Sequence, residues 1–486
     1  MTDDDPGLPV PFGPVSNGEY QPKPLPPVLR ESIRRARDLC ERNARRTGMS
    51  RREFLLSLPG AAATLYALNA CTREAARREP GGRYEVHEEA TVEPEPAREA
   101  VGGDEFVFDI QGHLLEYDMN PAARDDTFWT RFPQQHCGED DPRVCFSIDH
   151  FVDLMFRRSD TNMVVISALP IWPESSPLSH EVMDETRRVV EGLCRDDRVL
   201  LHGLALPNVG SFEANVEAMA DAVSRFRISA WKTFTNFPDA FGQPGNAWWL
   251  DDHDRALPRV GERFIRASVD LGVSTICTHK GLSGGSPYAS PIDVGPAARA
   301  HPEVNFVMYH SGYEDELVEG PYRRRTANVG INRLITSMKR AGIGPNENVY
   351  AELGTTWWNV MRFPDQAAHV LGKLLKHVGE DNVVWGTDCL FYGSPQPQIQ
   401  ALRAFQISEE YQERFGYPPL TKEIKAKILG LSGARLYGVD PITVPCEFGR
   451  RELEEIRKQL PGRNEPLGPK TSAEVAAFRA AHQGWP

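Results

Sequence analysis

The stretch that decides the fold is FVFDIQGHLLE, residues 106–116, in which an apolar run leads directly into a polar tip. The first half has the aromatic and β-branched character of a buried strand. Alternate side chains of a strand share one face, so Asp109, Gln111 and His113 can point the same way. The segment therefore predicts a first barrel strand that ends with an amide and an imidazole side by side.

Seven further apolar runs of strand length follow the first, and helical patterns separate them, as at residues 212–226 behind the candidate N-cap Ser211. Strands that alternate with helices in this way predict an α/β fold, a (β/α)8 TIM-type barrel over residues 105–440. No GxGxxG motif follows an early strand, which argues against a dinucleotide-binding fold. The runs are residues 106–110, 163–169, 199–206, 228–234, 273–277, 304–309, 348–353 and 383–385.

Polar residues follow each of the last five strands, where barrel enzymes place their sites. His113, His279 and Asp388 are candidate ligands of a divalent metal, most often zinc, which leaves one position open for water. The metal would lower the pKa of that water from about 15.7 to about 7, and Asp388 would accept the proton. His310 would be a further ligand or would polarise the substrate. The alternatives are a helix cap for Asp388 and structural roles for the later histidines.

Two further groups near the strand ends have open interpretations. Lys232 is expected to anchor a substrate carboxylate or carbonyl, and the alternative is a structural ion pair with Glu352 as its buried partner. Residues 248–249 and 357–358 are tryptophan pairs, which predict either aromatic walls for a flat substrate or ordinary packing.

The first 104 residues are predicted to lie outside the barrel. Residues 1–48 begin with proline, glycine and acidic residues and continue with a basic stretch, which predicts a disordered extension. The string SRREFLL at residues 50–56 precedes an apolar stretch, so residues 49–71 are predicted to be an export signal. The alternative is an amphipathic helix with an arginine pair. Residues 72–104 show no hydrophobic period and predict a disordered linker.

The composition of the chain excludes several classes of protein. The chain has 486 residues and a formal charge of -13, which argues against nucleic acid as a partner and suits a soluble enzyme. Its eight cysteines form no CxxC pair, so a zinc ribbon and a disulfide scaffold are not indicated; one Cys137–Cys145 bridge stays open. Residues 441–486 form a polar tail with expected helices at 450–459 and 472–482.

Several strings resemble known families. DIQGH, THKG, YHSG and GTD, in this order at strand ends, resemble the amidohydrolase superfamily, in particular the amidohydrolase-related branch that includes decarboxylases of the aminocarboxymuconate-semialdehyde type. Residues 425–440 resemble the closing helix of that branch, with Ser432 and Gly433 where an asparagine is typical. SRREFLL resembles the twin-arginine export motif. The strings stand at residues 109–113, 278–281, 309–312 and 386–388.

The resemblance implies metal ligands at His113, His279 and Asp388, and a further site histidine at His310. Gln111 stands where the first histidine of an HxH motif is typical. An amide oxygen binds zinc poorly, which implies a weaker site, a different metal or none. Some members carry a carboxylated lysine that bridges two metals at the position of Lys232; with the first histidine missing, a single ion is expected here.

We therefore expect a hydrolase of a small-molecule amide, ester or lactone that uses one divalent ion, Zn2+, as its cofactor. The alternatives are a non-oxidative metal-dependent decarboxylase and a metal-free extracytoplasmic binding protein, which Gln111 keeps open. The resemblance of SRREFLL implies transfer by the twin-arginine machinery to the periplasm, with Met49 as an alternative start. Residues 68–71 resemble a lipoprotein box, which implies a lipid anchor at Cys71. A homodimer is expected by analogy with barrels of this branch.

Overall fold

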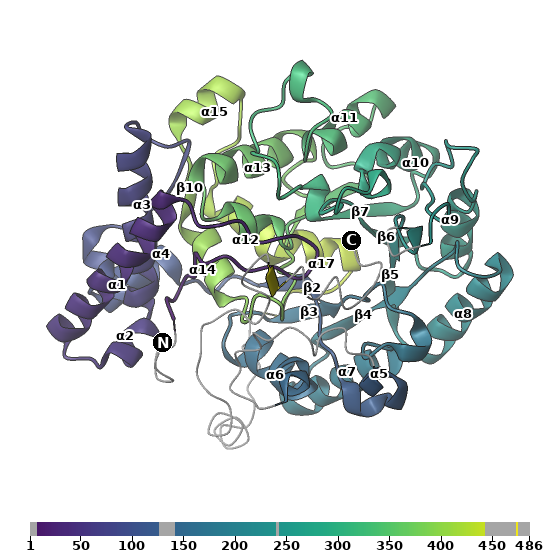
Figure 1. Ribbon diagram of the computed structural model, residues 1–486, viewed down its shortest axis with the longest axis horizontal. Helices are drawn as coiled ribbons and strands as arrows, with labels where there is room; N and C mark the ends of the chain where they lie inside the picture. Colours follow the sequence, from purple (N-terminus) through teal and green to yellow (C-terminus); the bar gives the residue numbers. More distant parts are fainter. Residues whose placement is uncertain (1–6, 126–140, 240–242, 443–472, 475–486) are drawn as a thin grey trace.

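The computed structural model describes residues 7–125, 141–239, 243–442 and 473–474. Its centre is a parallel barrel of eight strands that pair in chain order from β2 to β9 (Figure 1). This confirms the TIM-type barrel that the sequence predicts, and every predicted run overlaps one strand. The strands are β2 (Phe108–Gly112), β3 (Met163–Ile166), β4 (Val199–Leu204), β5 (Ile228–Phe234), β6 (Thr275–His279), β7 (Asn305–Tyr309), β8 (Val349–Glu352) and β9 (Val383–Val384).

The barrel closes between its last and first strands through main-chain contacts. The Ile110 amide donates to the Trp385 carbonyl at 3.0 Å, and the Asp388 amide donates to the Gln111 carbonyl at 3.0 Å. Gly112 and Cys389 form an isolated parallel bridge beside them. Closure therefore places Asp388, which lies shortly after β9, directly against Gln111 at the polar tip of β2.

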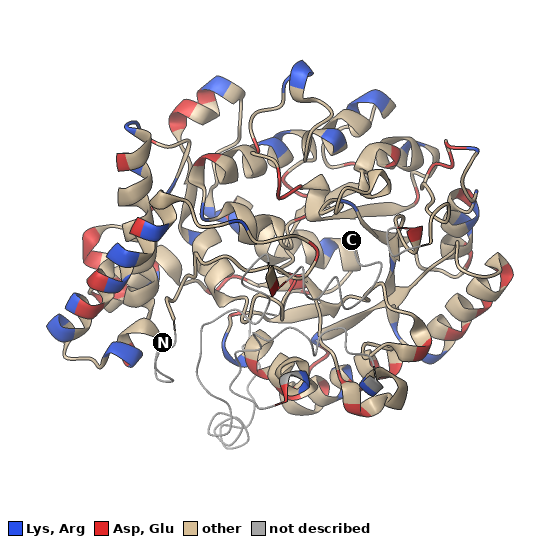
Figure 2. Ribbon diagram, in the orientation of Figure 1, with Lys and Arg blue, Asp and Glu red and all other residues tan. Residues whose placement is uncertain are grey.

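Helices surround the barrel, and charged residues are distributed over these helices and the loops between them (Figure 2). Ser211 caps α8, because its hydroxyl accepts a hydrogen bond from the Ala214 amide at 3.2 Å. The elements between and after the strands are α5 (Pro121–Asp125), α6 (Ile148–Val152), α7 (His180–Cys194), α8 (Phe212–Arg225), α9 (Gly261–Asp270), α10 (Val294–Ala300), α11 (Asn332–Ala341), α12 (Thr356–Val360), α13 (Pro364–His377), α14 (Gln396–Ala404), β10 (Phe405–Ile407), α15 (Glu409–Phe415), α16 (Lys422–Ala426) and α17 (Ser432–Tyr437).

The segment that resembles a closing helix is bent by a π-helical turn, Lys427–Leu431, between α16 and α17. It passes very close to the first strand. A Cβ atom at Gly430 would lie 2.1 Å from the Phe106 carbonyl oxygen, so only glycine fits there. The close approach lets the last helices cover the barrel next to β2.

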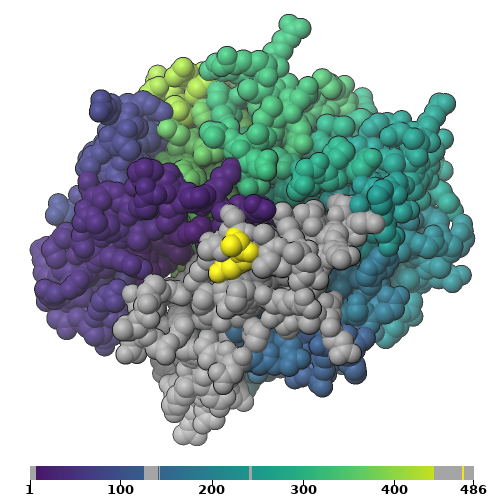
Figure 3. Space-filling view, in the orientation of Figure 1, coloured from purple at the N-terminus to yellow at the C-terminus, as the bar shows by residue number. Residues whose placement is uncertain are grey.

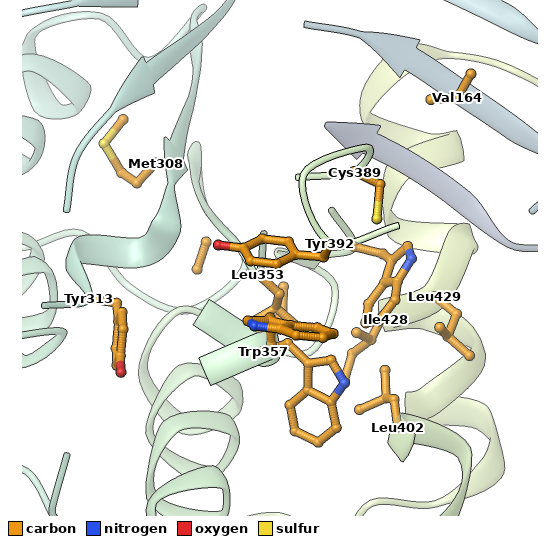
Figure 4. Close-up of a cluster of buried hydrophobic side chains, with 14 of the residues drawn as sticks. Val164, Met308, Tyr313, Leu353, Trp357, Cys389, Tyr392, Leu402, Ile428 and Leu429 are labelled. Atoms are coloured by element: carbon orange, nitrogen blue, oxygen red, sulfur yellow. The ribbon is translucent and has the colours of Figure 1, made fainter. Parts of the chain in front are cut away.

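Buried tryptophans fill the space between the barrel and its later helices (Figure 4). The Trp357 indole donates to the Gln398 carbonyl at 3.0 Å, and the Trp358 ring stacks on Tyr392 with the centroids 4.7 Å apart. Trp248 packs edge-on against Phe264 at 5.8 Å. These three side chains have the packing role that the sequence left open, because their partners belong to the core.

The N-terminal region differs from the expected disordered extension and linker. It forms α1 (Pro27–Thr47), α2 (Arg51–Leu55), α3 (Leu58–Ala76), β1 (Gly82–Tyr84) and α4 (Pro94–Val101), which lie together on one side of the barrel (Figure 1). β1 pairs antiparallel with β10, which ties this region to the barrel. The difference arises because the packed face of α1 consists largely of small residues such as Ala36, Cys40 and Ala44, which give a weak hydrophobic pattern.

The apolar stretch of the predicted export signal forms most of α3. Leu65 and Leu68 are fully buried there and belong to the main core. The preceding string forms a capping box, in which Ser50 accepts from the Glu53 amide at 3.2 Å and Glu53 accepts from the Ser50 amide at 2.8 Å. Within the described residues, no helix has the length and apolar character needed to cross a bilayer. The export signal itself stays a prediction.

The predicted disulfide bond and the predicted C-terminal helices involve residues outside the described part of the chain. Cys145 takes part in a disulfide bond, as does Cys194, whereas the predicted partner Cys137 lies outside the described residues. The helices expected at 450–459 and 472–482 also lie outside them, apart from residues 473–474. The domain boundaries proposed from the sequence stay predictions.

Candidate active site

One small cavity lies at the C-terminal ends of the barrel strands, and all six site residues predicted from the sequence line it. The space open to the centre of a water-sized sphere is about 20 Å³, enough for one small molecule or ion. Convergence of strand ends explains why residues so far apart in the chain meet here. The lining consists of Asn17, Glu19, Gln111, His113, Ala168, Leu169, Pro170, Lys232, Phe234, His279, His310, Asp388 and Phe391.

His113 and Asp388 form a buried pair on the side of the cavity where the barrel closes. The Ser167 carbonyl accepts from His113 Nδ1 at 2.7 Å, which leaves Nε2 facing Asp388 Oδ1 at 3.0 Å. Gln111 Nε2 donates to the same carboxylate oxygen at 3.0 Å. Gln111 Oε1 is buried, and no group of the described residues donates a hydrogen bond to it.

Both oxygens of the Asp388 carboxylate accept hydrogen bonds. Besides Gln111 on Oδ1, the Thr355 hydroxyl donates to Oδ2 at 2.5 Å and Asn17 Nδ2 donates to it at 2.7 Å. Burial alone would raise the pKa of this carboxyl, but the donors and the nearby imidazoles hold the pKa below its ordinary value. Asp388 is therefore a stable anion in this site.

The rings of the other two histidines meet edge to face in the cavity wall, with centroids 4.7 Å apart. His310 Nδ1 donates to the Gly354 carbonyl at 2.8 Å, so its Nε2 is available to a ligand. The His279 ring stacks on Phe234 at 5.4 Å. Burial lowers the pKa of His310 to about 4 and that of His279 well below its usual range. Both imidazoles are thus neutral near pH 7, which is the form that binds metals.

His310 and Asp388 also share an unusual backbone conformation. Their φ angles are +63° and +60°, and that of Thr355 is +56°, in the left-handed region that non-glycine residues seldom adopt. Such conformations are concentrated at functional sites. The positive φ angles turn these side chains toward the cavity at the point where each strand ends.

Lys232 lies on the cavity wall with its Nζ atom 3.4 Å from the centroid of the Tyr309 ring. Burial lowers its pKa to about 8. No carboxylate of the described residues forms a salt bridge with it, so the alternative interpretation, an ion pair with Glu352, does not hold there. Glu352 instead accepts hydrogen bonds from the amides of His310, at 3.0 Å, and Gly354. The Lys232 ammonium is free to face a substrate anion.

Sequence reasoning missed seven of the thirteen lining residues, and four of these define the character of the cavity. Phe234 and Phe391 form its aromatic side, and the tryptophan pairs are absent from its lining. Asn17 and Glu19 come from the N-terminal segment, residues 7–26, which lies across the barrel mouth (Figure 1). No local pattern in that segment indicates a site, since it lacks a strand or helix period.

The donor set fits a divalent cation. One oxygen of Glu19 and one nitrogen each of His279 and His310 lie within 4.8 Å of one another, whereas ligand atoms around one ion with bonds of about 2.0–2.2 Å are roughly 3–4.4 Å apart. Imidazole nitrogens and carboxylate oxygens are ligands of zinc and related divalent ions. His113, Asp388 and the unpaired Gln111 Oε1 lie in the same cavity and extend the set.

An eight-stranded barrel with imidazoles and a carboxylate at its C-terminal mouth is the architecture of a barrel enzyme. The family described as "Amidohydrolase" matches residues 178–439, more than half of the chain. The chain therefore belongs to the amidohydrolase family, whose members are enzymes. No curated protein sequence matches it.

Several solved structures resemble the chain over most of their own length. 5-Carboxyvanillate decarboxylase from Novosphingobium aromaticivorans, complexed with manganese and 4-hydroxy-3-methoxy-5-nitrobenzoic acid, is 12% identical, with 70% of this chain and 97% of that chain covered and a TM-score of 0.39. An amidohydrolase II is 12% identical, with coverages of 68% and 99% and a TM-score of 0.41. A uronate isomerase from Bacillus halodurans is 11% identical, with coverages of 70% and 94% and a TM-score of 0.37.

Proposed function

We propose that the protein is a metal-dependent lyase that removes carbon dioxide from a small carboxylic acid. The observation that carries this proposal is the setting of Asp388, whose two carboxylate oxygens accept hydrogen bonds from Gln111, Thr355 and Asn17. A hydrolase that activates water needs a base with a pKa near the working pH. A carboxylate whose two oxygens already accept hydrogen bonds is better suited to bind a cation than to remove a proton.

The residues of the cavity match the needs of decarboxylation. A divalent ion held by His113, His279, His310 and Asp388 would bind substrate oxygen atoms and withdraw electron density from them. When the bond to the carboxylate carbon breaks, its electron pair remains on the adjacent substrate carbon, which must then receive a proton. Lys232, with a pKa of about 8, is mostly protonated at pH 7 and able to donate that proton.

The apolar part of the lining supports the same reaction. Leu169, Phe234 and Phe391 face the cavity and exclude water from one side of it. A carboxylate that loses its hydration is closer in energy to neutral carbon dioxide, which needs no hydration shell. Suitable substrates are carboxylic acids whose remaining carbon can delocalise an electron pair, such as β-keto acids and hydroxybenzoates.

Isotope labelling distinguishes this proposal from hydrolysis. In D2O a decarboxylase releases carbon dioxide and places one deuterium on the product carbon, which mass spectrometry detects. In H2 18O a hydrolase transfers 18O to the product acid. We expect the first result with the wild-type protein and its loss in Lys232→Met. Incorporation of 18O from an ester, lactone or amide without release of carbon dioxide would contradict the proposal.

Hydrolysis is the second candidate, because the cavity has room for a water molecule beside the imidazoles. For that reaction a zinc ion would supply a hydroxide at neutral pH. The two candidates differ in the role of Lys232, which would bind rather than protonate the substrate in a hydrolase. Lys232→Met would then raise KM and leave kcat within about tenfold of the wild type.

We also propose that the protein acts outside the cytoplasm. The SRREFLL string supports export by a route that carries folded proteins, and the disulfide-bonded Cys145 and Cys194 suit an oxidising compartment. Fractionation of producing cells, with the enzyme followed by immunoblot, tests the location. Recovery of all the protein in the cytoplasmic fraction would contradict the proposal.

A further inference from the structure

The N-terminal segment, residues 7–26, is built into the barrel mouth. Tyr20 is buried, and its hydroxyl donates to the Val15 carbonyl at 2.5 Å and lies 3.3 Å from the Tyr392 hydroxyl. Arg362 donates to the Gly13 carbonyl at 2.9 Å. The segment reaches the surface on the face seen in Figure 3, where it lies next to later parts of the chain. These contacts hold it in one position over the cavity.

The segment directs two polar side chains inward. Asn17 is 3% exposed, and its Nδ2 donates both to Asp388 Oδ2 at 2.7 Å and to Glu19 Oε2 at 2.6 Å. Its Oδ1 accepts from the Glu19 amide at 3.1 Å. Asn17 therefore bridges the two carboxylates and fixes the direction of the Glu19 side chain.

The Glu19 carboxylate spans the two neutral histidines. Its Oε1 lies 3.5 Å from His279 Nε2, and its Oε2 lies 3.9 Å from His310 Nε2. These separations are longer than direct hydrogen bonds and suit ligand atoms that share one ion. The Glu19 side chain is 19% exposed, so the carboxylate closes the cavity at its outer side.

We infer that Glu19 is a ligand of the metal centre, supplied by the N-terminal segment to barrel residues His279 and His310. The inference rests on the proposed function, because it takes the site to hold a divalent ion, and it takes residues 7–26 to stay attached to the exported chain. A second observation supports it: the Oε1 atom of Gln111 is buried at the same cavity and has no partner in the described residues. An extra carboxylate supplies the strong ligand that this amide does not, and its negative charge offsets that of the cation.

Metal binding by the full-length protein tests this inference without any substrate. The protein is stripped with a chelator, and its affinity for Zn2+ is measured in competition with a fluorescent chelator. We expect Glu19→Gln to weaken binding by about tenfold or more, as loss of a ligand should cost at least as much as loss of a supporting hydrogen bond. Glu19→Asp should recover part of the affinity. The matched control is Glu31→Gln, the same change on exposed α1.

Cobalt provides a second readout. The visible absorption of Co2+ depends on the number and type of its ligands, so Glu19→Gln should shift the spectrum whereas Glu31→Gln should leave it unchanged. If Glu19→Gln matches the wild type in both affinity and spectrum while His279→Ala loses the metal, the inference is overturned and the metal centre stands. If the wild type binds neither ion, the metal centre fails, and the inference fails with it.

Discussion

Helix α3 provides a quantitative test of whether the N-terminal region is part of the folded enzyme. Leu65 lies on α3 with none of its side chain exposed, and it belongs to the main hydrophobic core. Replacement by alanine removes three carbon atoms, which at about 0.8 kcal/mol each gives roughly 2.4 kcal/mol of lost transfer free energy. The cavity that remains adds to this loss, so we expect Leu65→Ala to lower the free energy of unfolding by about 2.5–4 kcal/mol.

The assay is urea unfolding followed by tryptophan fluorescence, with the intact mass of each sample determined first. Leu56→Ala is the matched control, because the Leu56 side chain is 49% exposed at the end of α2 and should cost less than about 1 kcal/mol. Equal stabilities for both variants would refute the packing of α3. An intact mass that begins at Cys71 would show instead that residues 1–70 are removed with the signal.

Three further perturbations test the site and the pH response. Asp388→Asn should abolish turnover and leave the fold intact, because it removes an anion but little volume; more than a tenth of wild-type activity would contradict a central role. Gln111→His should tighten Zn2+ binding about tenfold by replacing an amide with an imidazole, and unchanged affinity in the competition assay would show that residue 111 makes no contact with the ion. His369 is buried beside Tyr411 and Tyr417, and burial lowers its pKa to about 4. In the unfolded chain this histidine binds a proton near pH 6.5, whereas in the folded protein it does so only near pH 4. The free energy of unfolding therefore falls as the pH drops from about 6.5 to 4, and the loss is about 2 kcal/mol at pH 5. Urea titrations at several pH values should show that the free energy of unfolding of His369→Gln falls less with acidification than that of the wild type. If the two pH profiles run parallel, the assignment to His369 is contradicted.

The barrel and most of the site were predictable because their signals are local. Each strand is a short apolar run, and the polar residue that follows it identifies the C-terminal end, as with His310 after β7 and Asp388 after β9. Closure of the barrel then brings these ends together without further information. The role of Asp388 as a proton acceptor stays a prediction. The hydrogen bonds that surround its carboxylate come from residues far apart in the chain, so the sequence could not indicate them.

The N-terminal contributions were not predictable for a physical reason. Asn17 and Glu19 act through contacts with residues hundreds of positions away, and their own segment has no period that indicates a site. The packed face of α1 consists largely of alanine and other small residues, which hydrophobic patterns detect poorly. Strand β1 has three residues and forms only because β10 pairs with it. The tryptophan pairs were ambiguous, because core packing and a cavity wall require the same side chains.

The bond from Asn17 to Asp388 joins residues 371 positions apart, and it has a consequence for biosynthesis. Asn17 leaves the ribosome long before Asp388, so it finds its partner only after nearly the whole barrel has been made. Closing so long a loop is slow relative to local folding, so the mouth of the barrel is assembled last. A truncated or partly synthesised chain would have His279 and His310 without Glu19 correctly placed beside them. Completion of the chain, rather than formation of the barrel, would thus be the event that switches the site on.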